Sequence, residues 1–332
     1  MDRIFLGFDT SNYRTSAAAV NECGEVLFQS AQLLDVKKGE RGLRQSEAFF
    51  AHSNRLPGMT EALFEAVDAS CVAAAGASER PRRAEGSYMP CFLAGMNTAR
   101  EIGSALGVPV YTFSHQEGHA AAVLDDDDER VLFMHLSGGT TEFLVCVPDE
   151  NGYDMRIAGG TKDISIGQLM DRTGVALGYS FPSGAYLDDI AYETLERAGF
   201  DGSRIEMPGL MPKIKLSDDA YFNLSGAETK LLRRIESGIT EDEAGMLITE
   251  LFITVSRLLE TAADSLSEKY GIEKVCMAGG VASSRTVRKL ISSDGHKADI
   301  RFGSPELSGD NAVGAALLAR RVHETGNRIT GK

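Results

Sequence analysis

The sequence predicts an α/β fold built as two related lobes that face a shared cleft. Short apolar runs typical of strands alternate with segments of helical spacing, a pattern that favours α/β architecture. A strand, a small polar turn and a hairpin occur near the N-terminus, and the same series recurs at residues 131–157. With 332 residues, 43% of them hydrophobic, the chain can bury a full core and favours two domains over one.

The first copy starts with an expected strand at residues 4–8, which runs into Asp9-Thr10-Ser11. A hairpin of residues 16–20 and 25–29 should follow. Helical spacing covers residues 47–67 and is broken near Pro57, because proline cannot donate the backbone hydrogen bond of a helix interior. A helix at 95–106 and a short strand at 108–111 should end the lobe.

The second copy starts with a strand at 131–136, which runs into Ser137-Gly138-Gly139-Thr140-Thr141. We expect a hairpin of 142–147 and 153–157, a buried strand at 275–278, and helices at 166–177, 186–197, 241–270, 284–290 and 311–322. The first lobe is therefore placed at residues 1–113, completed by the C-terminal helix 311–325. The second lobe is placed at 114–310, with the metal and nucleotide motifs.

The formal charge is −14, from 34 Lys and Arg against 48 Asp and Glu, which disfavours a polyanion as a partner of the whole surface. Nucleic acid would need a local basic strip, such as residues 80–83 or 285–289, or a basic partner protein. Five scattered cysteines without a CxxC pair argue against disulfides and favour a reducing cytoplasm. We expect neither a secretory signal nor a membrane span.

Three strand-end turns are candidates for a nucleotide site. They are Asp9 to Ser11, the turn at Ser137 to Thr141, and Gly279-Gly280. Small residues at strand ends expose backbone N–H groups that can hold phosphates, although each turn alone is more typical of a plain tight turn. Together they resemble the actin-like ATPase superfamily.

His115 and His119 stand four residues apart in HQEGH, a spacing that lets one metal ion bind both imidazoles on a helix face. Asp310, before the last helix, is a candidate third ligand, and two histidines with one carboxylate suit iron(II) or zinc. Surface histidines and a helix-capping aspartate explain the same residues without a metal.

Five motifs in this order resemble the TsaD family of tRNA N6-adenosine threonylcarbamoyltransferases, formerly described as glycoprotease or O-sialoglycoprotein endopeptidases. The motifs are HQEGH, LSGGTTEF, GQLMDRTGVALGYSFPSGAYLDDIA, MAGGVASSRTVR and SGDNA. The resemblance implies a two-lobed actin-like ATPase (ASKHA) fold with ribonuclease-H-like lobes. It also implies transfer of threonylcarbamoyl from threonylcarbamoyl-adenylate to N6 of adenosine in tRNA, with iron or zinc and with partner proteins.

The resemblance also implies site residues. His115, His119 and Asp310 match the metal ligands, and the backbone of Ser137, Gly138 and Gly139 matches the catalytic turn. The residues that match the binding of the adenylate, or of ATP, are His135, Leu136, Ser137, Gly138, Gly139, Asp171, Gly184, Asp188, Gly279, Gly280 and Ser284.

Several positions depart from the family pattern and mark a divergent member. Tyr13 and Arg14 replace an acidic pair, Thr140 replaces a histidine, and Ser284 replaces an adenosine-binding asparagine. Two alternatives to the tRNA transferase therefore stay open. One is a paralogue that binds adenine nucleotide and carbamoylates another acceptor, and the other is a non-catalytic nucleotide-binding subunit. Either could pair through the first lobe, as a homodimer or with a related actin-like subunit.

Overall fold

The computed structural model describes residues 3–11, 13–35, 43–125, 128–199, 209–291, 297–309 and 312–330. The chain forms two compact units. Unit 1 comprises residues 1–128, 147–155 and 309–332, and unit 2 comprises residues 129–146 and 156–308. This division places His115 and His119 in unit 1, whereas the sequence-based boundary assigns them to the second lobe; the domain assignment stays a prediction. Within the described ranges, no helix has the length and apolar composition that crossing a membrane requires.

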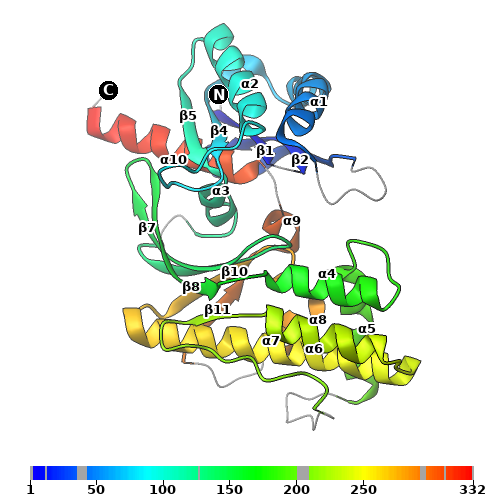
Figure 1. Cartoon of the computed structure of the whole chain (residues 1–332). Coiled ribbons are helices and arrows are strands. Elements are labelled where there is room, and N and C mark those ends of the chain that lie inside the picture. Colours follow the sequence, from blue (N-terminus) through cyan, green and yellow to red (C-terminus); the bar gives the residue numbers. More distant parts are fainter. Residues whose placement is uncertain are drawn as a thin grey trace. The chain divides into compact units, whose positions relative to one another are not determined.

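Unit 1 is built on a mixed sheet (Figure 1). Its strands are β1 (Ile4–Ser11), β2 (Arg14–Asn21), β3 (Val26–Leu33), β4 (Val72–Arg80) and β5 (Val110–Ser114). They lie in the order β3-β2-β1-β4-β5, with antiparallel pairing of β2 to β1 and β3, and parallel pairing of β4 to β1 and β5. The parallel strands β1, β4 and β5 therefore end at one common edge of the sheet.

Helices cover both faces of this sheet. They are α1 (Gln45–Ala66), α2 (Phe92–Leu106), α3 (His115–Ala121) and α10 (Val313–Thr330), with a 3-10 turn, η1 (Ala69–Cys71), before β4. Side chains alternate between faces along β1. Leu6 and Phe8 pack in the core with Leu63 of α1 and Ala99 of α2, whereas the Phe5 ring contacts His323 of α10.

The α10 helix lies directly on the backbone of the sheet. A Cβ atom at Gly7 would stand 2.1 Å from the carbonyl oxygen of Ala312, and one at Gly76 would stand 2.2 Å from that of Ala315. Glycine is therefore required at both strand positions for the helix to approach this closely. The C-terminal helix therefore packs on the sheet of unit 1.

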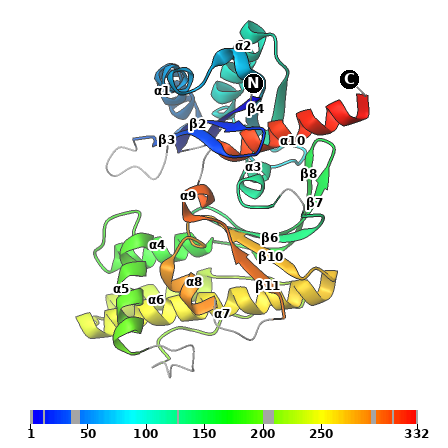
Figure 2. The same cartoon turned by 180° about the vertical axis from the view of Figure 1, so that it is seen from behind.

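Unit 2 contains a second mixed sheet (Figure 2). Its strands are β6 (Val131–Leu136), β7 (Thr141–Asp149), β8 (Gly152–Thr161), β9 (Tyr221–Phe222), β10 (Lys274–Ala278) and β11 (Asp299–Phe302), in the order β11-β10-β6-β7-β8-β9. β6 pairs antiparallel with β7 and parallel with β10, and β10 pairs parallel with β11. The tip of the hairpin between β7 and β8 belongs to unit 1.

The helices of unit 2 are α4 (Ile166–Ala176), α5 (Gly184–Arg197), α6 (Ser225–Glu236), α7 (Glu241–Tyr270), α8 (Arg285–Ile291) and α9 (Pro305–Ser308). The long helix α7 begins with Thr240, whose hydroxyl accepts the N–H of Glu243, and ends at Gly271 in the left-handed conformation. Its apolar stripe, including Leu251 and Val255, is fully buried. The stripe is core, as its helical spacing predicts.

The two sheets share one strand order. The order β8-β7-β6-β10-β11 of unit 2 repeats β3-β2-β1-β4-β5 of unit 1, and the directions of β6, β7, β10 and β11 repeat those of β1, β2, β4 and β5. This repetition confirms the α/β class and the two related lobes. The cleft between the lobes stays a prediction.

The break expected near Pro57 is wrong, because α1 continues through this proline. Buried residues on one face occur on both sides of it, with His52 and Leu56 before Pro57 and Met59 and Leu63 after it. The burial of this face stabilises the helix against the one backbone hydrogen bond that proline removes.

Candidate functional site

The histidine pair lies on α3, at the edge where β1, β4 and β5 end. Ser114 caps this short helix: its hydroxyl accepts the N–H of Glu117 at 3.2 Å, and the Glu117 carboxylate accepts the N–H of Ser114 at 2.8 Å. The other Glu117 oxygen accepts the N–H of Tyr153 at 3.2 Å. The buried glutamate of HQEGH therefore orients the helix and does not join the histidines.

The two imidazoles point at each other. Nε2 of His115 and Nε2 of His119 are 3.0 Å apart, and the ring planes are inclined by 78°. Nδ1 of His115 lies 2.8 Å from Oδ2 of Asp9, at the end of β1. Asp9 is buried, and it also accepts the N–H of Ser11 at 3.0 Å and the hydroxyl of Ser78 on β4.

The two imidazoles on α3 provide nitrogen atoms of the kind that bind a metal ion on one face of a helix. When Nδ1 of His115 donates its proton to Asp9, the lone pair of Nε2 is directed away from the carboxylate, and such carboxylate–histidine pairs orient metal ligands. Asp9 was expected in a phosphate-binding turn, and its contact with His115 was missed because 106 residues separate them. The signal that points to it is that Asp9 ends β1 and HQEGH follows β5, two parallel strands of one sheet that are separated only by β4 and end at the same edge.

A complete ligand set is not seen in the described part of the chain, where no group of three His, Cys, Asp or Glu side chains could hold a metal ion. The expected third ligand, Asp310, lies outside the described residues. Nearby, α10 packs on α3 so closely that a Cβ at Gly314 would stand 1.8 Å from the carbonyl oxygen of Gly118. His115 and His119 thus fit a metal ion as two of its ligands.

The glycine turn after β6 is the central feature of unit 2. The Ser137 N–H donates to the carbonyl oxygen of Thr140 at 2.8 Å, and the Thr140 N–H donates to the Ser137 hydroxyl at 3.1 Å. Gly138 and Gly139 are exposed, and a Cβ on either would meet no atom within 4 Å. Of the three residues expected to present N–H groups, the turn itself uses Ser137, which leaves the backbone of the two glycines accessible.

Two other segments pack on this turn. A Cβ at Gly167, in the first turn of α4, would lie 2.6 Å from Cα of Gly138, and the Ser165 hydroxyl donates to the Gly138 carbonyl oxygen at 2.6 Å. Gly279 has φ +110°, and a Cβ there would lie 2.3 Å from the carbonyl oxygen of Leu136. The glycine turns at 137–139 and 279–280, predicted to act together, are therefore in contact.

The predicted carboxylates are also close to this turn, through helix ends. Oδ1 of Asp171 accepts the N–H groups of Ser183 and Gly184, at 2.8 and 3.1 Å, at the start of α5. Asp188 accepts the Ser284 hydroxyl at 2.5 Å and the N–H groups of Arg285 and Thr286 at the start of α8. Both carboxylates cap helices in this structure.

The candidate residues of unit 2 form a continuous chain of contacts. The glycine turn contacts α4, α4 carries Asp171, Asp171 holds the start of α5, and α5 carries Asp188, which holds Ser284. The Ser283 hydroxyl donates to the Gly279 carbonyl oxygen at 3.1 Å and closes the path. His135 and Leu136 are buried in β6. Their roles in substrate binding stay predictions.

Two departures from the family pattern have defined positions in unit 1. Tyr13 is 38% exposed, and Arg14 begins β2, where its guanidinium would lie 3.2 Å from a Cβ at Gly309. A permanent positive charge thus stands beside the residue that precedes Asp310 in sequence.

The strand order that both sheets share is that of the actin-like ATPase fold. Solved structures of this class share the fold. Component A of (R)-2-hydroxyglutaryl-CoA dehydratase from Acidaminococcus fermentans has a TM-score of 0.55 and 15% identity, over 97% of this chain and 99% of that one. HypF from T. kodakarensis has a TM-score of 0.53 and 14% identity, over 96% of this chain and 48% of that one.

Sequence comparison gives the family. The model of the TsaD family, tRNA N6-adenosine threonylcarbamoyltransferase, matches residues 27–317, and the chain belongs to this family. A relative of that name from Neorickettsia sennetsu is 26% identical over 325 residues, covering 96% of this chain and 93% of the relative. One from Streptococcus pneumoniae is 28% identical over 317 residues, covering 94% and 90%.

Proposed function

We propose that the protein transfers a threonylcarbamoyl group from threonylcarbamoyl-adenylate to N6 of an adenosine in tRNA, as an acyltransferase of the N(6)-L-threonylcarbamoyladenine synthase type. The observation that carries the proposal is the family match over 27–317, which includes both the histidine pair and the glycine turns. Curated relatives that match more than nine-tenths of this chain have this activity as their name.

Among the groups of this chain, the backbone N–H groups of the glycine turn are the ones proposed to assist the transfer. Transfer forms a bond between N6 and the carbamoyl carbon and breaks the bond from that carbon to the phosphate oxygen, so AMP leaves and N6 loses one proton. The N–H groups of Gly138 and Gly139 can donate to the phosphate or to the oxygen on which charge develops. No side-chain nucleophile is needed, because the attacking amine belongs to the acceptor.

A divalent metal, iron or zinc, would be held by His115 and His119, with Asp310 as the proposed third ligand. Bound there, it would act as a Lewis acid and position substrate oxygens. Asp9 serves this site by holding Nδ1 of His115 at 2.8 Å, which fixes the direction of the ring.

The metal assignment is tested by the double variant His115→Ala/His119→Ala. The purified wild type should contain close to one equivalent of iron or zinc, and the variant should contain none at an unchanged melting profile. Asp9→Asn should weaken metal affinity roughly 10 to 100-fold, because the carboxylate that orients the ring of His115 is lost. Metal content that is the same in all three proteins would refute the site.

The transfer is tested with threonylcarbamoyl-adenylate and unmodified tRNA, by detecting the modified nucleoside after digestion. Gly138→Ala and Gly139→Ala probe the turn, because a methyl group fits both positions sterically and yet stands where the ligand would bind. Each should lower the rate while the fold is kept. Full activity in both variants would exclude the turn from the reaction.

Arg14 favours a second candidate, a paralogue that binds adenine nucleotide without acting on tRNA. Its guanidinium, next to Gly309, adds positive charge where the family has an acidic pair, and positive charge disfavours a cation nearby. Nucleotide binding by calorimetry without transfer to tRNA would select this candidate. Arg14→Glu would then be expected to raise metal affinity.

The proposed surface that binds a partner lies on unit 1. The partner is either a second copy of this chain or a related actin-like subunit. Phe50 on α1 is 69% exposed, and the edge strand β3 exposes Val26, Leu27 and Leu33. Apolar side chains exposed on an edge strand and on a helix are typical of protein interfaces. We place this assembly in the cytoplasm, since none of the five cysteines, all of which the structure describes, forms a disulfide.

A further inference from the structure

We infer that a lysine-lined pocket of unit 2, distinct from the glycine turns, binds the phosphate backbone of the RNA acceptor. The inference rests on the proposed function for the identity of the RNA. The pocket has a volume of about 410 Å³ and lies between the β8–α4 loop, the segment 212–223 and α6. Its charged lining residues are Lys162, Lys213, Lys215 and Lys230.

The charge of this pocket is not compensated. All four lysine side chains are exposed, and within the described residues no carboxylate lies within 4.0 Å of any of the four ammonium groups. In the part of the chain that the structure describes, no acidic residue lines the pocket. In a chain with a net charge of −14, four such cations in one place form a local positive field that attracts anions.

The basic strips visible in the sequence do not offer such a field. Arg80 pairs with Glu79 at 3.0 Å, and Arg83 pairs with Asp149 at 2.7 Å. In the second strip, Arg285 pairs with Asp189 at 2.5 Å, and Lys289 pairs with Glu196. These cations are neutralised by neighbouring carboxylates, so the pocket is the better candidate for phosphate binding.

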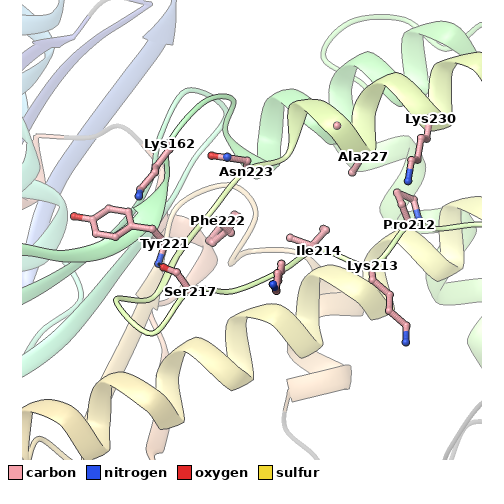
Figure 3. A pocket seen from close by; sticks show the side chains of 12 residues that line it. Lys162, Pro212, Lys213, Ile214, Ser217, Tyr221, Phe222, Asn223, Ala227 and Lys230 are labelled. Atoms are coloured by element: carbon pink, nitrogen blue, oxygen red, sulfur yellow. The ribbon is translucent and has the colours of Figure 1, made fainter.

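The other lining groups suit a nucleic acid. Figure 3 shows Lys162 beside the ring of Tyr221 at one end of the pocket and Lys230 near Pro212 at the other, with the Lys162 ammonium 4.9 Å from the ring centroid. Asn223 offers an exposed amide, and Phe222 is buried beneath it. Lysines that hold phosphates beside an aromatic ring that stacks on a base are typical of single-stranded nucleic-acid sites.

The start of α6, beside the pocket, is capped by Asp163. Oδ1 and Oδ2 of Asp163 accept the N–H groups of Leu224 and Ser225, at 2.9 and 3.0 Å. Burial would raise the pKa of Asp163, but these hydrogen bonds, with that from Ile164, outweigh it and lower the pKa to about 2. The next helix residues, Gly226 and Ala227, line the pocket, and the ionised Asp163 offsets the positive end of the helix dipole there, so the field of the pocket comes from its lysines.

Salt-dependent binding of unmodified tRNA tests the inference. Lys213→Gln/Lys215→Gln/Lys230→Gln should lower affinity at least roughly tenfold at about 50 mM salt, and should reduce the slope of log K against log salt by about 2, because each lost phosphate contact removes ~0.7 to 0.9. The control is Arg197→Gln/Lys297→Gln/Arg301→Gln, whose cations pair with Glu193, Glu268 and Asp299. The control changes the net charge equally and should leave the slope unchanged.

The outcomes separate the pocket from the proposed function. Equal tRNA affinity in the wild type and the lysine variant overturns the inference, even if the wild type transfers threonylcarbamoyl. Loss of tRNA binding in the lysine variant alone supports it, even if the wild type proves inactive. Pyrophosphate binding, measured by calorimetry and lost in the variant while tRNA affinity is kept, would show a small-anion site and overturn it. Thermal melting of each variant confirms that it is folded.

Discussion

At the scale of single residues, two carboxylates assigned to substrate binding serve as helix caps. Asp171 accepts the first N–H groups of α5, and Asp188 accepts those of α8. A carboxylate has more than one lone pair, so a cap and a ligand contact are compatible in the same group. Binding and stability are therefore expected to change together when either residue is replaced.

Two substitutions at Asp171 separate its roles. Asp171→Ala removes the acceptor for Ser183 and Gly184 and should cost about 0.5 to 2 kcal/mol of stability. Asp171→Asn keeps an oxygen for the cap and should cost less. If Asp171 also binds the adenylate, both variants should lose at least roughly tenfold in nucleotide affinity, since a hydrogen bond to a charged group contributes about 1.5 to 3 kcal/mol. Calorimetry and melting curves report the two effects; full affinity in both would remove Asp171 from the site.

His52 makes the stability of unit 1 depend on pH. Burial lowers its pKa, while the Ser11 backbone and the charge of Asp9 act in the opposite sense. The folded state therefore resists protonation, so the stability that His52 contributes is complete above about pH 6.5 and falls as the pH drops below the unfolded pKa. His52→Gln should flatten the fall in unfolding free energy between about pH 6.5 and 5, as measured by urea titration. An unchanged slope would contradict this.

At the scale of elements, the sequence predicted the helices and strands that have a strong apolar pattern. The bounds of β6 and α7 agree with the expected ranges. β4 was missed, because its run of alanine, glycine and serine has low strand propensity. These small residues are explained by α10, which lies on the backbone at Gly76. The need for small residues in β4 comes from a helix more than 200 residues later in the chain. The sequence near β4 therefore does not reveal it.

The candidate site was predictable from the sequence only where its residues lie close together in the chain. HQEGH and the glycine turns are local motifs, and their spacing indicated their chemistry. The contact from Asp9 to His115 and the lysine pocket join residues distant in sequence, so they depend on the strand order. The basic strips at 80–83 and 285–289 stay predictions; Arg83 and Arg285 pair with carboxylates of other elements, and the local sequence does not reveal these partners.

The turn after β10 offers a matched pair of substitutions. Gly279→Ala places a methyl group 2.3 Å from the Leu136 carbonyl oxygen at φ +110°, so it should cost at least about 1 to 3 kcal/mol and displace the glycine turn. Gly280→Ala meets no atom within 4 Å and should be close to neutral in stability. Urea unfolding measures both. Equal stability of the two variants would show that the turn adapts without cost.

At the scale of the whole molecule, the proposed association through unit 1 can be measured directly. Phe50→Asp should convert a dimer, or a complex with a subunit, into a monomer by light scattering, because it places a charge in an apolar interface. Met246→Asp, on an exposed position of α7 in unit 2, should leave the mass unchanged. A wild type that is monomeric and captures no related subunit would contradict the proposal.

The packing of α10 on β1 and β4 has a consequence for synthesis. The strands of unit 1 leave the ribosome first, yet the helix that covers one of their faces is translated last. At about 5 to 20 residues per second, roughly 10 to 40 seconds separate β5 from α10. During that interval the nascent sheet exposes an apolar face, whereas unit 2 is already complete at Ser308. Unit 1 is therefore expected to become native only after unit 2 has been synthesised.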